Sequence, residues 1–229
     1  RIHPIQHDGN ETFHRDATEI SGGIFADPFH GESLTTERPL TARIFAVDAY
    51  RQRYLAHLRT ILNESFHWDH FEPRVTAYTG LIESDVYSDS IKETSNADFL
   101  SDIDTQEGEL RTFIDDRREF LLSHPEVDHD SPLILSAELV GEADPVANKP
   151  TPIEMQFGDG PSIEQATLFY TVQQDGQYTG IIMTADSDRS YRGEIPAQLA
   201  GTSVYYYVEA LAAAGTGTVS YFPSRAEGA

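Results

Sequence analysis

The spacing of the apolar residues changes near residue 127, and this change constrains the fold more than any other feature. Between about residues 39 and 123, apolar residues recur every three or four positions, as they do in amphipathic helices. Beyond residue 127, apolar residues alternate with polar ones, as in strands with one buried face. The joining segment 124–132 is polar and contains two prolines, which suits a domain boundary. The sequence therefore predicts an α+β chain of two domains, a mostly helical one at 1–127 and an antiparallel β-sandwich at 130–226.

The helical part contains four amphipathic segments and one short turn. They are expected at Pro39–Val47, Ala49–Phe66, Asp69–Tyr87 and Glu109–Ser123, with the turn after Asn96. Each long helix is expected to bury one apolar stripe: Tyr50, Tyr54, Leu58, Ile61 and Leu62 in the second segment, and Phe71, Val75, Tyr78, Ile82 and Val86 in the third. Trp68 is expected to be a packing anchor. Arg117 and Arg118 are expected to form surface ion pairs with Asp115 and Asp116.

The second part contains seven strand-like segments separated by glycine- and aspartate-rich turns. They are Leu133–Val140, Ile153–Phe157, Ala166–Gln173, Tyr178–Met183, Tyr191–Ile195, Ser203–Ala212 and Thr218–Phe222. Seven short strands within about 95 residues favour a sandwich of the immunoglobulin or fibronectin-III type.

The charge and the lack of cysteine exclude several classes of function. The net charge is −22, so the phosphate backbone of a nucleic acid would be repelled and no nucleic-acid partner is expected. With no Cys, the chain has no disulfide, thiolate metal site or Cys nucleophile. No apolar run approaches the roughly 20 residues of a membrane span. Only Lys92 and Lys149 are lysines. That scarcity fits either adaptation to salty water or a GC-rich genome encoding an ordinary acidic secreted protein.

The densest group of metal-capable side chains lies at the beginning of the chain. His3, His7 and Asp8 are weak candidates for a transition-metal site, because a loop could bring two imidazoles and a carboxylate together. The alternative is a polar loop whose histidines make hydrogen bonds. The pairs Asp102/Asp104 and Asp186/Asp188 could hold calcium, but without an EF-hand pattern they are better explained as caps and turns.

No catalytic residue is predicted. The triplet His14–Arg15–Asp16 is similar to a kinase catalytic loop, but the metal-binding Asn expected five residues after the Asp is replaced by Ser21. No Gly-x-Ser-x-Gly nucleophile elbow is present.

Two ordered blocks of the helical part resemble the C-terminal portion of CotH-type (spore-coat protein H) atypical kinases. The first block comprises Leu40–Val47 and Tyr50–Leu58, and the second comprises Gly108–Ile114 and Arg117–Leu122. The segment Gly201–Ala210 resembles the Ig-like or fibronectin-like modules that often follow such domains. The resemblance implies a secreted or cell-surface protein that transfers phosphate from ATP to Ser or Thr, with a divalent metal.

The nucleotide and metal motifs of that family are not visible in this chain, so no cofactor site is predicted within it. The chain begins at Arg1 without a signal peptide, and we expect it to be a processed product or a fragment that is inactive alone. Its main partner would be the upstream kinase-like half of the parent. One alternative is a non-enzymatic extracellular module that binds protein or polysaccharide. Another is a metal-dependent hydrolase that uses the histidine-rich loop.

Overall fold

The computed structural model describes residues 23–141, 144–174, 176–213 and 217–226. The predicted fold class is confirmed: helices come first, and two four-stranded antiparallel sheets follow. The α-helices are α1 (Pro39–Phe45), α2 (Asp48–Glu64), α3 (Trp68–Ser88), α4 (Asn96–Asp102) and α5 (Glu109–Leu122), preceded by a 3-10 helix at Gly23–Phe25. The strands are β1 (Ile134–Leu139), β2 (Thr151–Phe157), β3 (Ile163–Thr171), β4 (Thr179–Ile182), β5 (Thr184–Ser187), β6 (Ser190–Ile195), β7 (Tyr205–Ala212) and β8 (Val219–Phe222).

The contacts divide the chain into two compact units, and one boundary between them lies between Val127 and Asp128. Residues 47–60, which include most of α2, group with the sandwich rather than with the other helices. That residues 1–127 and 130–226 form two separate domains therefore stays a prediction. No helix in the described ranges is long and apolar enough to cross a membrane.

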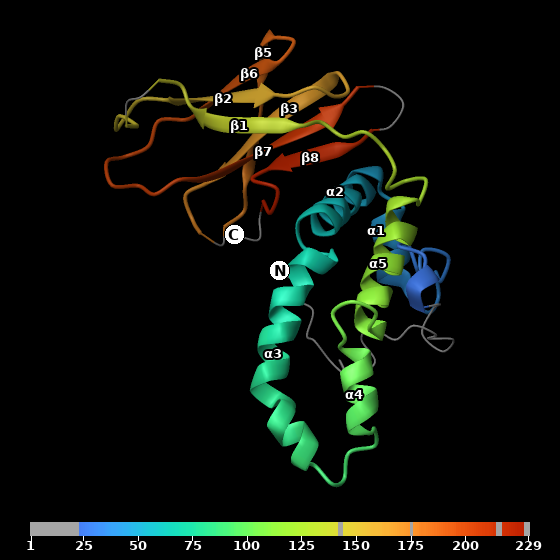
Figure 1. The fold of residues 1–229 in the computed structure, drawn as a ribbon. Coiled ribbons are helices and arrows are strands. Elements are labelled where there is room, and N and C mark those ends of the chain that lie inside the picture. Colours follow the sequence, from blue (N-terminus) through green and yellow to red (C-terminus); the bar gives the residue numbers. More distant parts are fainter. Residues whose placement is uncertain (1–22, 142–143, 175, 214–216, 227–229) are drawn as a thin grey trace. The chain divides into compact units, whose positions relative to one another are not determined.

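The helical unit is a hairpin of α3 against α4 and α5, and the chain runs out along α3 and back through the other two (Figure 1). Helix α4 begins at a capping box, in which the Ser95 hydroxyl accepts a hydrogen bond from the Asp98 backbone amide while the Asp98 carboxylate accepts one from the Ser95 amide. The core of the unit is small and lies at one end of α3, around Ile24, Trp68, Phe113 and Ile114. Trp68 is buried there, as predicted.

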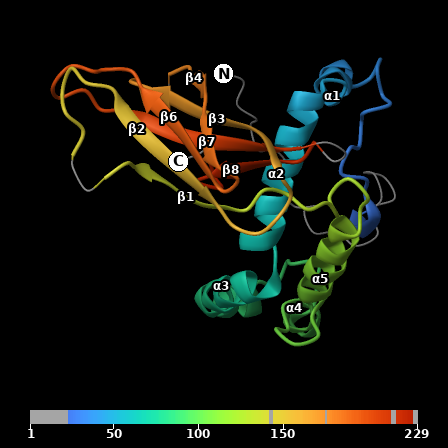
Figure 2. The same ribbon diagram turned by 90° about the horizontal axis from the view of Figure 1, so that it is seen from above.

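The sandwich has strand order β1-β2-β6-β5 in one sheet and β4-β3-β7-β8 in the other. Seen from above, β2 runs between β1 and β6 (Figure 2). The chain changes sheets at Met183, because β4 pairs with β3 in one layer and β5 pairs with β6 in the other. Seven of the eight strands overlap the predicted segments; β5, which was expected to belong to a turn, was missed.

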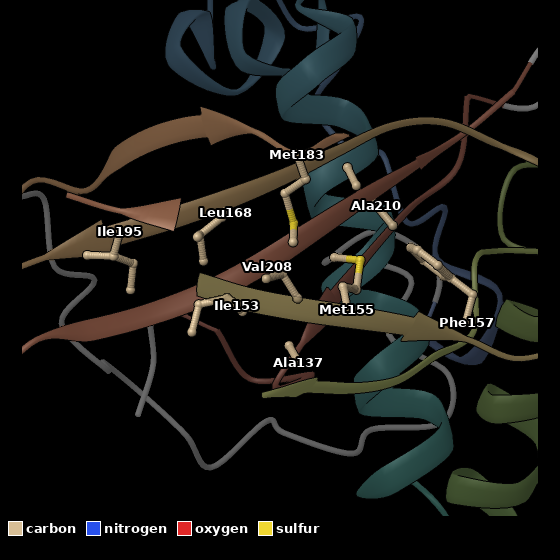
Figure 3. Packing of buried hydrophobic residues seen from close by; sticks show 10 residues of the cluster. Ala137, Ile153, Met155, Phe157, Leu168, Met183, Ile195, Val208 and Ala210 are labelled. Carbon is tan, nitrogen blue, oxygen red and sulfur yellow. The ribbon is translucent and has the colours of Figure 1, made fainter. Parts of the chain in front are cut away.

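Between the sheets lies an aliphatic core with side chains that are almost completely inaccessible to water. Ile153 and Met155 of β2 meet Leu168 of β3 and Val208 of β7, and all four are 0% exposed (Figure 3). Alternate residues of β2 and β7 contribute to this core, which is the pattern that the sequence predicted. The core holds the strand ends and their loops in fixed positions.

Candidate functional site

The structure does not test the metal site suggested by the sequence. His3, His7 and Asp8 lie outside the described residues, as does the triplet His14–Arg15–Asp16. Within the described part of the chain, no three His, Asp or Glu side chains come close enough together to hold a metal ion. The metal-site prediction therefore remains a prediction.

The two acidic pairs have local structural roles. The Asp104 carboxylate accepts hydrogen bonds from the backbone amides of Gln106 and Glu107, both at 2.8 Å. These bonds lower the pKa of Asp104, because they favour its charged form. Asp186 lies 3.5 Å from the guanidinium of Arg192. These partners agree with the interpretation of these carboxylates as caps and turn residues.

The two lysines are far apart in the sequence and in different units. The Lys92 ammonium donates to the backbone carbonyls of Val86, at 2.7 Å, and Asp89, at 3.0 Å, and so caps the end of α3. Lys149 lies in the loop between β1 and β2. Phosphoryl transfer needs a lysine on the phosphates and carboxylates on a metal. The described residues contain no such combination.

Two arginines of α5 contact backbone carbonyls from other segments of the helical unit, which the sequence did not predict. Arg117 donates to the carbonyls of Ile24 and Ala26, and Arg118 donates to the carbonyl of Leu62 at 3.0 Å. The surface pairs expected of Arg117 and Arg118 with Asp115 and Asp116 stay a prediction. Arg111 forms an α5 ion pair with Asp115 at the i,i+4 spacing, at 3.4 Å. Charge-assisted bonds from Arg117 and Arg118 tie segments that are distant in sequence.

Helices α3 and α4 and their connecting loop expose several large apolar side chains. Tyr78 is 65% exposed, Leu81 76% and Ile91 91%, and they are joined by Ile82 and Leu100. We call these five residues the α3–α4 apolar surface. Tyr78, Leu81 and Ile82 share one face of α3 because they are three and four positions apart. Of the stripe predicted to be buried, Phe71 and Val75 contact the core of the unit and Val86 is half-buried, whereas Tyr78 and Ile82 are exposed.

A second cluster joins residues 47–60 to the sandwich, within one unit. The imidazole of His57 stacks on the ring of Tyr221, with centroids 5.4 Å apart and planes at 7°, and the Arg53 guanidinium lies 5.9 Å from the same ring. Burial, followed by the neighbouring charge of Glu209 and a hydrogen bond to it, raises the pKa of Tyr221. Burial, followed by the charge of Arg53, lowers the pKa of His57. The cluster is a packed aromatic contact between residues 47–60 and the sandwich.

The profile of the family described as CotH kinase protein matches residues 1–121, which is more than half of the chain. This protein belongs to the CotH kinase protein family. The resemblance seen in the two helical sequence blocks is thereby confirmed. The match ends in α5, so the sandwich lies outside it.

The other comparisons add little. No curated protein matches the sequence. Among solved structures, an engineered protein determined at 1.98 Å resolution is similar over 49% of this chain and 25% of its own chain, with 16% identity and a TM-score of 0.26. The matched part of this chain thus covers a quarter of the length of that solved chain.

Proposed function

We propose that this chain is the C-terminal portion of a secreted CotH-type protein kinase. In this proposal the helical unit completes the kinase domain, and the sandwich is an accessory module that follows it. Support comes from the family match over residues 1–121, which covers nearly the whole helical part. The single observation that carries the proposal further is the α3–α4 apolar surface.

That surface is the kind of face that a protein domain covers. Isolated apolar side chains are common on protein surfaces, but several large ones exposed on one helix, the next helix and their loop favour a contact site. Leu81 and Ile91 are more than three-quarters exposed, and each would release ordered water on burial, which stabilises the complex. The occupant we propose is the nucleotide-binding half of the kinase domain, because the residues that expose the surface lie inside the family match.

We propose that the chain transfers no phosphate by itself. ATP and a divalent metal would bind to the other half of the domain, which supplies the phosphate-contacting lysine and the metal-binding carboxylates. The positions of Lys92 and Lys149 support this division, because one caps α3 and the other belongs to the sandwich. The role of the helical unit is then to support the catalytic half and to help form the surface for the protein substrate.

We also propose that the sandwich is an immunoglobulin-like module. The order β1-β2-β6-β5 corresponds to strands A-B-E-D of that architecture, and β3-β7-β8 corresponds to C-F-G, with β4 as an added edge strand beside C. Such modules present loops at both ends of the sheets, which suits contact with an extracellular protein or polysaccharide.

A phosphate-transfer assay tests the proposal. The 229-residue chain and the longer protein encoded by the same reading frame would each be incubated with labelled ATP, Mg²⁺ or Mn²⁺ and a Ser/Thr-containing protein acceptor. We expect incorporation of phosphate with the longer protein and none with the chain. Phosphate transfer by the chain alone would refute the division of labour between the two halves.

The second candidate function is a non-enzymatic extracellular binding module. The observation that favours it is a cavity of about 480 Å³ at one end of the sandwich. If the longer protein also incorporates no phosphate, this second function becomes the better explanation.

A further inference from the structure

The sandwich has an open cavity of about 480 Å³ between its two sheets at one end. Leu139 at the end of β1, Ile153 of β2 and Ile195 of β6 line it from one sheet, and Tyr206 of β7 lines it from the other. Residues 145–149, after β1, and 198–204, after β6, form its rim. The volume lies within the roughly 300–1,000 Å³ that small-molecule sites occupy.

The floor of this end cavity suits an alkyl chain. Ile153 and Ile195 are 0% and 3% exposed, so aliphatic groups form the deepest part. The hydroxyl of Tyr206 donates to the carbonyl of Ala137 at 3.2 Å and is therefore already engaged. Val146 and Leu199 at the rim are more than half exposed and extend the apolar lining outward. Leu139, Val146 and Leu199 keep exposed surface that an apolar ligand would remove from water.

The charged group at the mouth of the end cavity is a cation. Among the described residues that line it, Lys149 is the one charged residue and there is no Asp or Glu, although the chain has 38 of them and the exposed Asp144 precedes the lining residue Pro145. Within the described ranges, the Lys149 ammonium makes no hydrogen bond or ion pair. Glu138 and Glu194 alternate with the lining residues Leu139 and Ile195, so their strands direct them to the outer face of the sheet. An anionic group is therefore favoured at this rim, in a molecule that otherwise repels anions.

The two rim loops are tied to each other, so the cavity does not have to be built by the ligand. The Asn148 amide donates to the Gln198 carbonyl at 2.8 Å and joins the loops, while the Lys149 amide donates to the Val146 carbonyl at 3.2 Å. Asn148 has a φ of 60°, a left-handed conformation that Asn tolerates better than most residues. A preformed rim lowers the entropic cost of binding.

We infer that the end cavity binds a small anionic amphiphile, a straight-chain carboxylate of roughly eight to ten carbons whose alkyl chain enters between the sheets and whose carboxylate faces Lys149. Aliphatic walls with one cation at the mouth are complementary to such a molecule. A sugar would lack the exposed aromatic platform on which it could stack, since Tyr206 is the one aromatic lining residue. The inference stands independently of the proposed kinase function.

Isothermal titration of the purified 229-residue chain with sodium hexanoate, octanoate and decanoate tests the inference. Saturable 1:1 binding is expected, with affinity rising roughly fourfold for each added methylene. Lys149→Gln should weaken octanoate binding roughly two- to fivefold and leave octanol binding unchanged, because the lost contact is an exposed ion pair. Lys92→Gln removes the other lysine and changes the net charge by the same amount, and it should change the affinity for neither octanoate nor octanol.

A steric variant keeps the test independent of charge. Ala200 is an exposed lining residue, and Ala200→Trp should block the mouth and abolish octanoate binding. Ala185→Trp, at an exposed position on β5, should leave binding intact. Leu81→Gln should also have no effect, which separates the end cavity from the α3–α4 apolar surface. Absence of saturable binding, or binding unaffected by both Lys149→Gln and Ala200→Trp, would overturn the inference.

Discussion

Replacing Leu81 by alanine gives different expected results in the chain and in the longer protein. In the chain, the Leu81 side chain is 76% exposed, so its truncation removes little buried surface. A surface substitution of this kind changes the free energy of unfolding by no more than about 0.5 kcal/mol. Leucine and alanine also have similar helix propensities, so the α3 backbone should be unaffected.

In the longer protein, the same side chain should be buried against the other half of the kinase domain. Removing a buried leucine side chain costs about 2–5 kcal/mol, because apolar contact is lost and a cavity remains. The expected difference between the two proteins is therefore at least about 1.5 kcal/mol. Urea and thermal unfolding, followed by circular dichroism at a helix-sensitive wavelength, would measure it in both.

Two control variants calibrate this comparison. Ile182→Ala changes a 71% exposed residue on β4 of the sandwich and should cost little in either protein. Ile114→Val changes a residue with 0% exposure in the helical core and should cost about 1 kcal/mol in both. If Leu81→Ala has the same small effect in the longer protein as in the chain, the α3–α4 apolar surface does not contact the rest of the kinase domain.

Other expectations concern the sandwich core, a histidine and the beginning of the chain. Leu168→Ala removes a side chain with 0% exposure and should destabilise the protein by about 2–5 kcal/mol in urea denaturation, whereas a loss below about 1 kcal/mol would contradict the core described here. Folding lowers the pKa of His57 from its ordinary 6.5, mainly by burial and then by the charge of Arg53. As the pH falls, His57 is therefore protonated in the unfolded chain at a higher pH than in the folded protein. The free energy of unfolding should therefore decrease below about pH 6.5, and the decrease should be smaller in His57→Gln. The same pH profile in both proteins would contradict this role of His57. Elemental analysis of the purified chain should find no stoichiometric transition metal. A bound metal that is lost in His3→Ala or His7→Ala would instead show a metal site at these histidines.

The fold of the sandwich could be predicted well because its signals are local. Alternating apolar residues and Gly-containing turns specify strands directly, and only β5 escaped prediction. Its four residues, Thr184–Ser187, are all exposed, so no buried face marks them as a strand. The strand is held by pairing with β6, and such pairing is not visible in the spacing of apolar residues.

The buried faces of the helices were harder to predict. In α2 the expected stripe included Leu62, which is buried, but also Tyr50 and Ile61, which are 55% and 50% exposed, and it missed the buried Leu55 and Arg59. Leu55, Arg59 and Leu62 follow a helical spacing, but the arginine hides the pattern because a charged residue is rarely buried. For α3 the spacing of apolar residues predicted a buried stripe, but spacing alone cannot show that Tyr78 and Ile82 remain exposed.

Little of the candidate sites could be read from the sequence. The end cavity depends on two loops that the Asn148–Gln198 hydrogen bond brings together. These residues are far apart in the sequence, so no short motif indicates that they meet. The family resemblance was visible because it rests on ordered blocks within the helices. The bonds of Arg117 to distant carbonyls could not be foreseen, because its acidic neighbours in the sequence offered a simpler partner.

Hydroxyl-radical footprinting of the chain and of the longer protein tests the central claim most directly. The method reports how far water reaches each side chain, and Tyr78 and Ile91 are strongly exposed in the chain. We expect both to be modified rapidly in the chain and at least several-fold more slowly in the longer protein, while Ile182 of the sandwich is modified equally in both. Equal modification of Tyr78 and Ile91 in the two proteins would contradict the claim that this helical unit completes a larger kinase domain.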